Sequence, residues 1–240
     1  MQNLILDDCF TAMATLPDGS IDCILADLPY GITQAKWDCE LPLDKLWAEY
    51  KRLAKPSCQI VLFAAQPFTS KLICSNLEMF KYCWYWEKER GTGFLNAKKQ
   101  PLRCVEEICV FYNKSNYNPQ MTKLEKPYKH MLPVSKSETV NKVMSFNSEP
   151  EYREHTHSYP KNILKFSRDN YNKRIHSTQK PLALLEYLVK THSKENDLIL
   201  DNCMGSGTAG VACKNLNRNF IGMELDPVMF EMASKRIENT

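Results

Sequence analysis

Apolar and polar residues follow two patterns along the chain. Short, continuous apolar runs are typical of buried strands, and longer runs with apolar residues three or four positions apart are typical of amphipathic helices. The first pattern predicts strands at 4–8, 20–27, 59–65, 81–88, 106–113, 162–166, 197–201 and 219–226. The second predicts helices at 41–55, 69–80, 180–193, 207–217 and 227–239.

The alternation of strands and helices predicts an α/β protein with a doubly wound, mostly parallel sheet. A length of 240 residues suits one domain that spans residues 1–240. The segment 114–175 interrupts the alternation with polar stretches and one convincing strand, 162–166, and the alternation resumes after it. We therefore expect 114–175 to be an inserted region that determines specificity.

Composition excludes several classes of protein. The hydrophobic fraction of 43% and the charged fraction of 25% are those of a globular domain. The ten cysteines form no CxxC pair and no zinc-binding spacing with histidine, which favours a reduced, intracellular protein without a bound metal. No stretch approaches the length of a membrane span, and the N-terminal residues do not resemble a secretory signal.

Positive charge is concentrated in the inserted region. Twelve Lys/Arg and six acidic residues give 114–175 a charge of +6, so the remainder carries −3. Seven aromatic residues are interleaved with these charges. This pattern suits a surface that binds a polyanion, although a solvated insertion is the alternative. Candidate phosphate contacts around the predicted strand are Lys161, Lys165 and Arg168.

A glycine-rich loop follows the predicted strand 197–201. Gly205, Gly207 and Gly210 satisfy the pattern GxGxxG, and Glu224 ends the next strand nineteen residues after Gly205. Such a loop brings backbone N–H groups close to a ligand, and the acid can accept hydrogen bonds from ribose hydroxyls. A tight strand-to-helix turn is the structural alternative. The pattern favours a cofactor that contains a nucleoside, with Ser206 and Thr208 also beside it.

The position of this loop separates two candidate cofactors. A nicotinamide dinucleotide fold places its glycine loop first, but here thirty residues follow Gly210. The loop is therefore expected last in a permuted strand order. Asp201, at the end of the preceding strand, suits an α-amino group better than a pyrophosphate. Both points favour S-adenosylmethionine (SAM).

An acid also ends the apolar strand 20–27, and a four-residue motif begins there. Asp27-Leu28-Pro29-Tyr30 resembles the DPPY motif of permuted, β-type DNA amino-methyltransferases, with Leu28 where that family most often has Pro. The stretches "DNCMGSGTAG", "HSTQKPLALLEYLV" and "LDDCF…LPDGSIDCILAD" resemble other motifs of the same family. The resemblance covers about 170 residues and implies a Rossmann-like, SAM-dependent methyltransferase fold in permuted order.

The resemblance also implies roles for individual residues. The Asp27 carboxylate and the Pro29 carbonyl would accept hydrogen bonds from the two N–H groups of an exocyclic amine. These hydrogen bonds would make the amine nitrogen nucleophilic. Tyr30 would stack on a base extruded from the duplex. Asp8 would contact the adenine of SAM, and Gln179 and Lys180 would lie beside its methionine moiety. Lower-ranked DNA contacts are Lys36, Trp37, Asn96 and Lys98.

We therefore expect a site-specific methyltransferase that acts on adenine N6 in double-stranded DNA. Asp27 favours adenine, and cytosine N4 is the nearest alternative. A non-catalytic DNA-binding protein and a methyltransferase for RNA or protein amides are further alternatives. The family also suggests a homodimer, a cognate restriction endonuclease and a cytoplasmic protein of bacterial or phage origin.

Overall fold

The structure, a computed structural model, describes residues 2–32, 35, 38–131, 152–167 and 179–240. It forms two compact units. The first unit contains residues 1–118 and 161–240, and the second contains residues 119–160. The second unit lies within the predicted insertion, and each unit is described by itself below.

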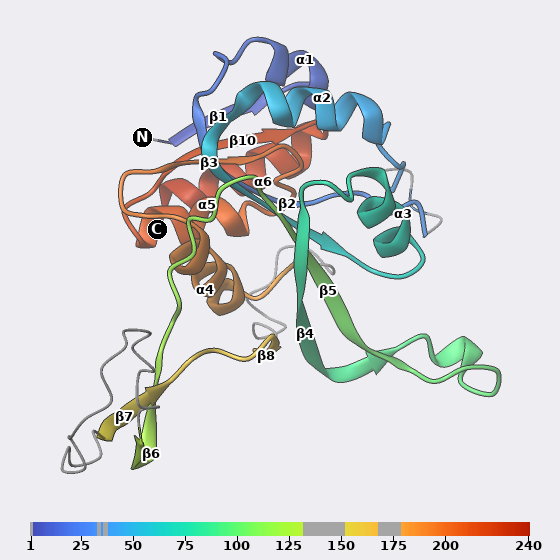
Figure 1. The fold of residues 1–240 in the computed structure, drawn as a ribbon. Coiled ribbons are helices and arrows are strands. Elements are labelled where there is room, and N and C mark those ends of the chain that lie inside the picture. Colours follow the sequence, from blue (N-terminus) through green and yellow to red (C-terminus); the bar gives the residue numbers. More distant parts are fainter. Residues whose placement is uncertain (1, 33–34, 36–37, 132–151, 168–178) are drawn as a thin grey trace. The chain divides into compact units, whose positions relative to one another are not determined.

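The first unit is built on an eight-stranded sheet with the order β1-β10-β9-β2-β3-β5-β4-β8 (Figure 1). The strands are β1 (Gln2–Leu6), β2 (Ile21–Asp27), β3 (Ala54–Ala64), β4 (Phe80–Thr92), β5 (Arg103–Phe111), β8 (Ile163–Lys165), β9 (Leu198–Asp201) and β10 (Asn219–Glu224). The five strands from β1 to β3 in this order are parallel. Both the α/β class and the permuted order predicted from the sequence are confirmed.

Helices cover both faces of this sheet (Figure 1). They are α1 (Cys9–Ala14), α2 (Leu43–Leu53), α3 (Phe68–Ser75), α4 (Leu182–His192), α5 (Thr208–Asn215) and α6 (Pro227–Glu238). One buried cluster joins α1, α2 and α3 to the sheet, and a second joins α4, α5 and α6. Neighbouring residues of the central strands serve different faces, since Ile24 packs in the first cluster and Leu25 in the second. Burial on both faces explains why these strands are continuous apolar runs.

The chain leaves β9 and β2, which are neighbours, in opposite directions. From β9 it passes through α5 to β10, and from β2 it passes through α2 to β3. The two helices lie on opposite faces of the sheet. Such a switch point separates the loops at the carboxyl ends of the strands, and ligands of doubly wound proteins bind there. The fold therefore places its site beside the ends of β2 and β9.

The other end of the sheet is antiparallel. β5 pairs antiparallel with both β3 and β4, and β8 adds to β4 in parallel. β4 and β5 form a long hairpin whose tip contains the short 3-10 helix η1 (Phe94–Asn96) (Figure 1). The hairpin reverses the chain without a crossover helix, which is why these strands cannot be parallel.

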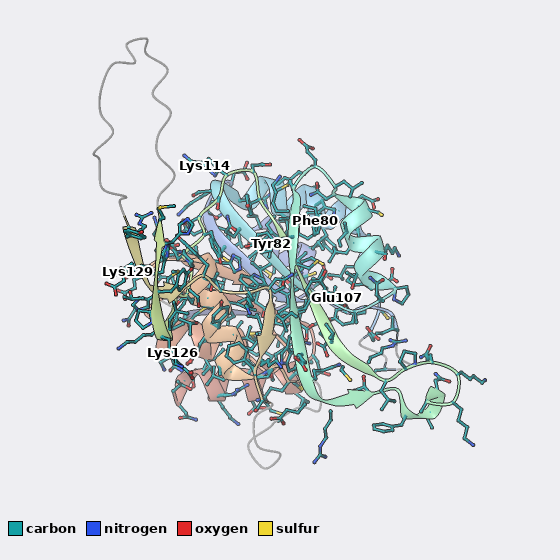
Figure 2. The ribbon with its side chains drawn as sticks, turned by 60° about the horizontal axis from the view of Figure 1, so that its bottom comes forward. Phe80, Tyr82, Glu107, Lys114, Lys126 and Lys129 are labelled. Carbon is teal, nitrogen blue, oxygen red and sulfur yellow. The ribbon has the colours of Figure 1, made fainter. Side chains whose placement is uncertain are left out.

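The second unit contains a two-stranded antiparallel sheet of β6 (Thr122–Met131) and β7 (Tyr152–Ser158). The sequence pattern predicted neither strand, so the expectation of a single strand in the insertion was wrong. Most residues of both strands are exposed, and without a buried face they lack apolar alternation. Lys126 and Lys129 both belong to β6 (Figure 2).

Candidate active site

Acidic residues lie at or just beyond the carboxyl ends of four adjacent strands. Glu224 ends β10 opposite Leu6, and Asp8 follows β1 by two residues. Asp201 ends β9 opposite Gly222, and Asp27 ends β2. Because these strands are parallel neighbours, all four carboxyl groups belong to the same edge, at and beside the switch point.

Asp27 is the centre of a network of charged side chains. Its Oδ1 accepts a hydrogen bond of 2.6 Å from the Tyr30 hydroxyl, and its Oδ2 lies 2.5 Å from Nζ of Lys180. Lys180 Nζ also lies 3.5 Å from Oε2 of Glu106. Oε1 of Glu106 pairs with Nζ of Lys88 at 3.0 Å. Two carboxylates and two ammonium groups thus alternate from Asp27 to Lys88.

These contacts shift the pKa values of Lys180, Glu106 and Tyr30. Burial alone would lower the pKa of Lys180, but the charges of Asp27 and Glu106 outweigh burial and raise it. Burial would raise the pKa of Glu106, yet Lys180 and Lys88 together lower it. Burial and the charge of Asp27 raise the pKa of the Tyr30 phenol, so its hydroxyl remains a donor at neutral pH. The Tyr30 hydroxyl and the Lys180 ammonium group therefore anchor the side chain of Asp27 from two sides.

The turn that follows Asp27 is held by Asp38. Oδ1 of Asp38 accepts hydrogen bonds from the backbone N–H groups of Tyr30 at 2.7 Å and Gly31 at 2.8 Å, and Oδ2 accepts one from Ile32 at 3.0 Å. The Asp38 side chain is buried. The sequence patterns did not identify this role of Asp38. A buried acid shortly after a turn rich in free N–H groups is the signal that could have identified it.

The residues of the predicted catalytic motif have different environments. Leu28 is buried in the core, so the position where this chain departs from the family motif serves packing. The Tyr30 ring stacks on Phe68 with centroids 5.3 Å apart and an interplanar angle of 23°. Pro29 and Tyr30 are partly exposed beside Asp27. One face of the Tyr30 ring is therefore supported by protein.

The glycine loop between β9 and α5 depends on backbone conformations that favour glycine. Gly205 and Gly207 have φ values of +49° and +69°. A Cβ at Gly205 would meet no atom within 4 Å, whereas a Cβ at Gly210 would lie 2.5 Å from Ile237. Gly210 thus allows close packing of α5 against α6, and Gly205 leaves open space at the edge of the sheet.

Glu224 holds this loop in place. Its Oε2 accepts a hydrogen bond of 2.9 Å from the N–H of Gly205. Its Oε1 accepts bonds of 3.0 Å from the N–H groups of Leu225 and Asp226. The residue predicted to bind a ribose is therefore also the residue that positions the loop. A carboxylate has about four acceptor positions, so one remains for a further donor.

Asp201 is a buried carboxyl group. Burial, helped by the charges of Asp27 and Glu224, raises its pKa to about 8 against the lowering effect of its hydrogen bond from the Cys203 N–H. That bond, to Oδ1, measures 3.0 Å. A positively charged ligand beside Asp201 would stabilise its ionised form.

The other predicted cofactor residues have structural partners of their own. Asp8 Oδ1 caps α1 through the N–H groups of Phe10 and Thr11. The hydroxyls of Ser206 and Thr208 lie 3.1 Å apart, and Arg236 of α6 donates to the Thr208 hydroxyl at 2.9 Å. Sequence reasoning did not identify Arg236. Gln179 is buried one residue before Lys180.

The predicted DNA contacts are dispersed. Asn96 and Lys98 are exposed at the tip of the β4–β5 hairpin, and Lys161 and Lys165 are exposed in the first unit. Nζ of Lys165 pairs with Oε2 of Glu87 at 3.1 Å. The three other predicted contacts, Lys36, Trp37 and Arg168, lie outside the described residues.

Two further properties concern the described part of the chain. It contains no group of three or more His, Cys, Asp or Glu side chains that could hold a metal ion. Among its helices, none combines the length and the apolar character that crossing a membrane requires.

A permuted, doubly wound sheet with a glycine loop and carboxylates at its switch point defines the class of nucleoside-cofactor methyltransferases. The family model described as N6_N4_Mtase, DNA methylase, matches residues 21–235. The chain therefore belongs to this family of DNA methyltransferases that act on adenine N6 or cytosine N4. SAM is the methyl donor of the family.

Individual relatives agree with this assignment. The type II methyltransferase M.HpaI of Haemophilus parainfluenzae is 27% identical over 254 residues, which cover 99% of this chain and 74% of that protein. M.HinfI of Haemophilus influenzae is 28% identical over 277 residues, which cover 99% of this chain and 68% of that protein.

Solved structures show the same fold. The complex of M1.HpyAVI with SAM superimposes with a TM-score of 0.67 at 25% identity and covers 99% of both chains. The cytosine-N4-specific PvuII DNA methyltransferase has a TM-score of 0.69 at 14% identity, with 99% of this chain and 90% of that one covered. At that identity, the likeness to the PvuII enzyme concerns the fold alone.

The residues present in the site fit SAM. SAM carries an ammonium and a sulfonium group, and the carboxyl groups of Asp27, Asp201 and Glu224 lie at this edge of the sheet. The open space beside Gly205 allows a ligand to approach the loop backbone. A cation beside the buried carboxyl group of Asp201 would stabilise its ionised form.

Proposed function

We propose that this DNA methyltransferase transfers its methyl group to the N6 amine of an adenine that is flipped out of a short duplex sequence. The observation that carries the proposal is the carboxylate of Asp27, which Tyr30 and Lys180 hold at the switch point. An anionic acceptor suits the exocyclic N–H groups of adenine. The motif of the family supports the choice of adenine, because Asp at this position is typical of its adenine-N6 members.

The chain's own residues would orient and activate the target amine. Each oxygen of Asp27 already accepts one donor and has room for another, so the carboxylate can accept an N–H from the base without releasing Tyr30 or Lys180. The Pro29 carbonyl would accept the second N–H. Two such bonds would localise the lone pair on the nitrogen, so that the nitrogen can take the methyl group as the sulfur–methyl bond breaks and leaves a neutral thioether. The methylated nitrogen would then release one proton to water. Because the donors and acceptors are fixed beforehand, no reorganisation is needed during the reaction.

Residues at the ends of β9 and β10 would hold the cofactor. SAM supplies an electrophilic methyl group on a sulfonium centre. We assign the ribose hydroxyls to Glu224 and the α-amino group to Asp201. Gly205 and Gly207 provide the close backbone approach, with Ser206 and Thr208 beside them. Asp8, Gln179 and Lys180 complete the proposed set, and Lys180 joins the cofactor residues to Asp27.

Sequencing of modified bases in DNA from cells that express the protein tests the proposal. We expect N6-methyladenine at one short sequence in cells with the wild type and none in cells with Asp27→Ala. Circular dichroism and SAM titration of the purified variant would show whether it remains folded and binds cofactor. N4-methylcytosine instead of N6-methyladenine would overturn the choice of base. Wild-type methylation by a folded Asp27→Ala protein would overturn the role of Asp27.

The proposed function also implies binding partners for this protein. We propose that the region 114–175 reads the target sequence and that Lys161, Lys165 and Arg168 contact phosphates. M.HpaI and M.HinfI are named type II methyltransferases. By analogy, we propose a bacterial or phage host, a cytoplasmic location and a cognate restriction endonuclease. A homodimer remains a prediction from the family.

A further inference from the structure

The tip of the β4–β5 hairpin exposes two large apolar side chains. Phe94 is 70% exposed and Leu95 is fully exposed, at 102%. Both lie in η1 at the end of the hairpin, which extends beyond the rest of the sheet (Figures 1 and 2). Side chains of this size are costly to expose to water unless a partner covers them.

The tip is an ordered structure. The N–H of Asn96 bonds to the carbonyl of Gly93 at 2.9 Å, and the N–H of Ala97 bonds to the carbonyl of Phe94 at 3.1 Å. Gly93 has a φ of +92°, and Gly91 lies so close to Leu102 that a Cβ there would be 2.7 Å from the Leu102 Cβ. The backbone thus holds Phe94 and Leu95 outward before any partner binds, which reduces the entropy lost on binding.

Only positive charge surrounds this apolar pair along the chain. Between Arg90 and Val105 there is no acidic residue. Four basic side chains occur there, and all are exposed: Arg90, Lys98, Lys99 and Arg103. An apolar tip with a basic surround complements a duplex, whose phosphates are negative and whose stacked bases are apolar.

The base of the same hairpin belongs to the catalytic network. Lys88 of β4 and Glu106 of β5 form the ion pair that contacts Lys180. Phe94 is six residues beyond Lys88, so it lies within about 20 Å of this pair at about 3.3 Å per residue. A duplex that delivers a base to Asp27 is therefore within reach of the tip.

We propose that Phe94 and Leu95 form an apolar wedge that enters the base stack at the target position and fills the space left by the flipped base. The proposal rests on the proposed function, because a wedge is needed only if the enzyme extrudes a base from a duplex. Insertion of apolar side chains between bases is an established way of compensating for lost stacking. Lys98 and Lys99 would hold the neighbouring phosphates.

The test compares two duplexes that carry the methylated sequence, once this is known from sequencing. In one duplex the target base is paired, and in the other it faces an abasic site. For Phe94→Ala/Leu95→Ala, we expect single-turnover transfer to the paired duplex to fall about tenfold or more, as for loss of a base-stacking side chain. On the abasic duplex the loss should shrink to about twofold, because no pair has to be opened.

Matched variants separate the wedge from general effects. Leu77→Ala removes a leucine that is 64% exposed elsewhere in the first unit and should leave both rates unchanged. Lys98→Gln/Lys99→Gln should weaken binding to both duplexes equally. With 2-aminopurine at the target position, the rise in fluorescence caused by flipping should be smaller for the double alanine variant than for the wild type. SAM affinity and circular dichroism should match the wild type.

Two outcomes would overturn the wedge alone, and a third would overturn the proposed function on which it rests. Equal loss on the paired and abasic duplexes would make the tip a simple docking surface. Unchanged methyl transfer by the double alanine variant would show that the tip has no part in flipping. If that variant also lost self-association in sedimentation, the tip would instead contact a second copy of the chain. A wild-type protein that methylates no duplex would overturn the proposed function itself, which distinguishes that failure from failure of the wedge alone.

Discussion

The hydroxyl of Tyr30 donates a hydrogen bond of 2.6 Å to Oδ1 of Asp27. The sequence indicated only the aromatic ring of Tyr30, as a surface on which a base would stack. The structure adds a second property, because the hydroxyl fixes the orientation of the carboxylate. The ring and the hydroxyl can be tested separately by single substitutions.

Removal of the Tyr30 hydroxyl should slow catalysis without affecting SAM binding. A hydrogen bond to a charged group is worth about 1.5–3 kcal/mol, so Tyr30→Phe should reduce kcat by roughly one to two orders of magnitude. Single-turnover methyl transfer measures the effect. Tyr82→Phe is the matched control, since the Tyr82 hydroxyl has no hydrogen-bond partner among the described residues. A Tyr30→Phe rate equal to that of the wild type would remove the hydroxyl from the mechanism.

Glu106 should be needed for stability because it lies between two ammonium groups. Glu106→Gln leaves Lys88, whose side chain is 5% exposed, without a counter-charge, and the free energy of unfolding should fall by about 3–5 kcal/mol. Since the pKa of Glu106 is lowered in the folded protein, its contribution is present at neutral pH and disappears as the pH falls below the ordinary value of 4.5.

Urea unfolding at several pH values measures this contribution of Glu106. The difference between wild type and Glu106→Gln should shrink on acidification. Glu107→Gln changes the adjacent carboxylate, which accepts a bond from the Thr69 hydroxyl at 3.3 Å, and serves as the control. A loss for Glu107→Gln as large as that for Glu106→Gln would contradict the assigned importance of the lysine pair.

Binding of SAM should release a proton from Asp201. With a pKa of about 8, this carboxyl group is mostly protonated in the free protein at pH 7, and a cationic ligand favours its ionised form. Calorimetry in two buffers of different ionisation enthalpy should show release of about one proton per ligand. Asp201→Asn should abolish the release, whereas Asp44→Asn, at an exposed position in α2, should not. Identical proton release by wild type and Asp201→Asn would refute the assignment.

The same group affects the stability of the free protein. A raised pKa means that the folded state disfavours ionisation of Asp201. Its stabilising protonated form is therefore complete below the ordinary pKa of 3.8 and is lost as the pH rises towards about 8. The stability of Asp201→Asn should not share this decline.

Lysines of the second unit should make DNA binding sensitive to salt. Lys126 and Lys129 are exposed on β6, and replacement of a lysine that contacts a phosphate should reduce the slope of log affinity against log salt by about one. Salt titrations of Lys126→Gln and Lys129→Gln measure the slopes. Lys235→Gln is the control, because Lys235 pairs with Glu231 on α6. Unchanged slopes for both β6 variants would exclude this strand from phosphate contact.

The buried part of the fold was predictable from the sequence, and the polar part was not. Continuous apolar runs located β2, β9 and β10 to within two residues and the second half of β3, because burial on both faces allows only such runs. The six residues of α1 are too few for a helical period, and they were not predicted. β6 and β7 lack a buried face, so their sequences show no apolar pattern from which the hydrogen-bonded pairing could have been predicted.

Part of the candidate site could likewise be predicted from the sequence, and part of it could not. The ends of parallel strands meet at one edge, so an acid at a strand end could be placed from sequence at Asp27, Asp201 and Glu224. The ion pair of Asp27 with Lys180 joins residues 153 positions apart, and Glu106 reaches it only because β5 is antiparallel. Neither relationship follows from local sequence, because both depend on the order and direction of strands.

The pairing of β1 with β10 has a consequence for synthesis on the ribosome. β1 is translated before β10 but pairs with it, and β10 is made more than 200 residues later, since Leu6 lies opposite Glu224. At about 5–20 residues per second, β1 waits roughly 10–40 s for its partner. Asp8 and Glu224, two of the proposed SAM-binding residues, lie near the ends of these two strands. A nascent chain therefore cannot be stabilised by bound SAM until translation has almost passed β10.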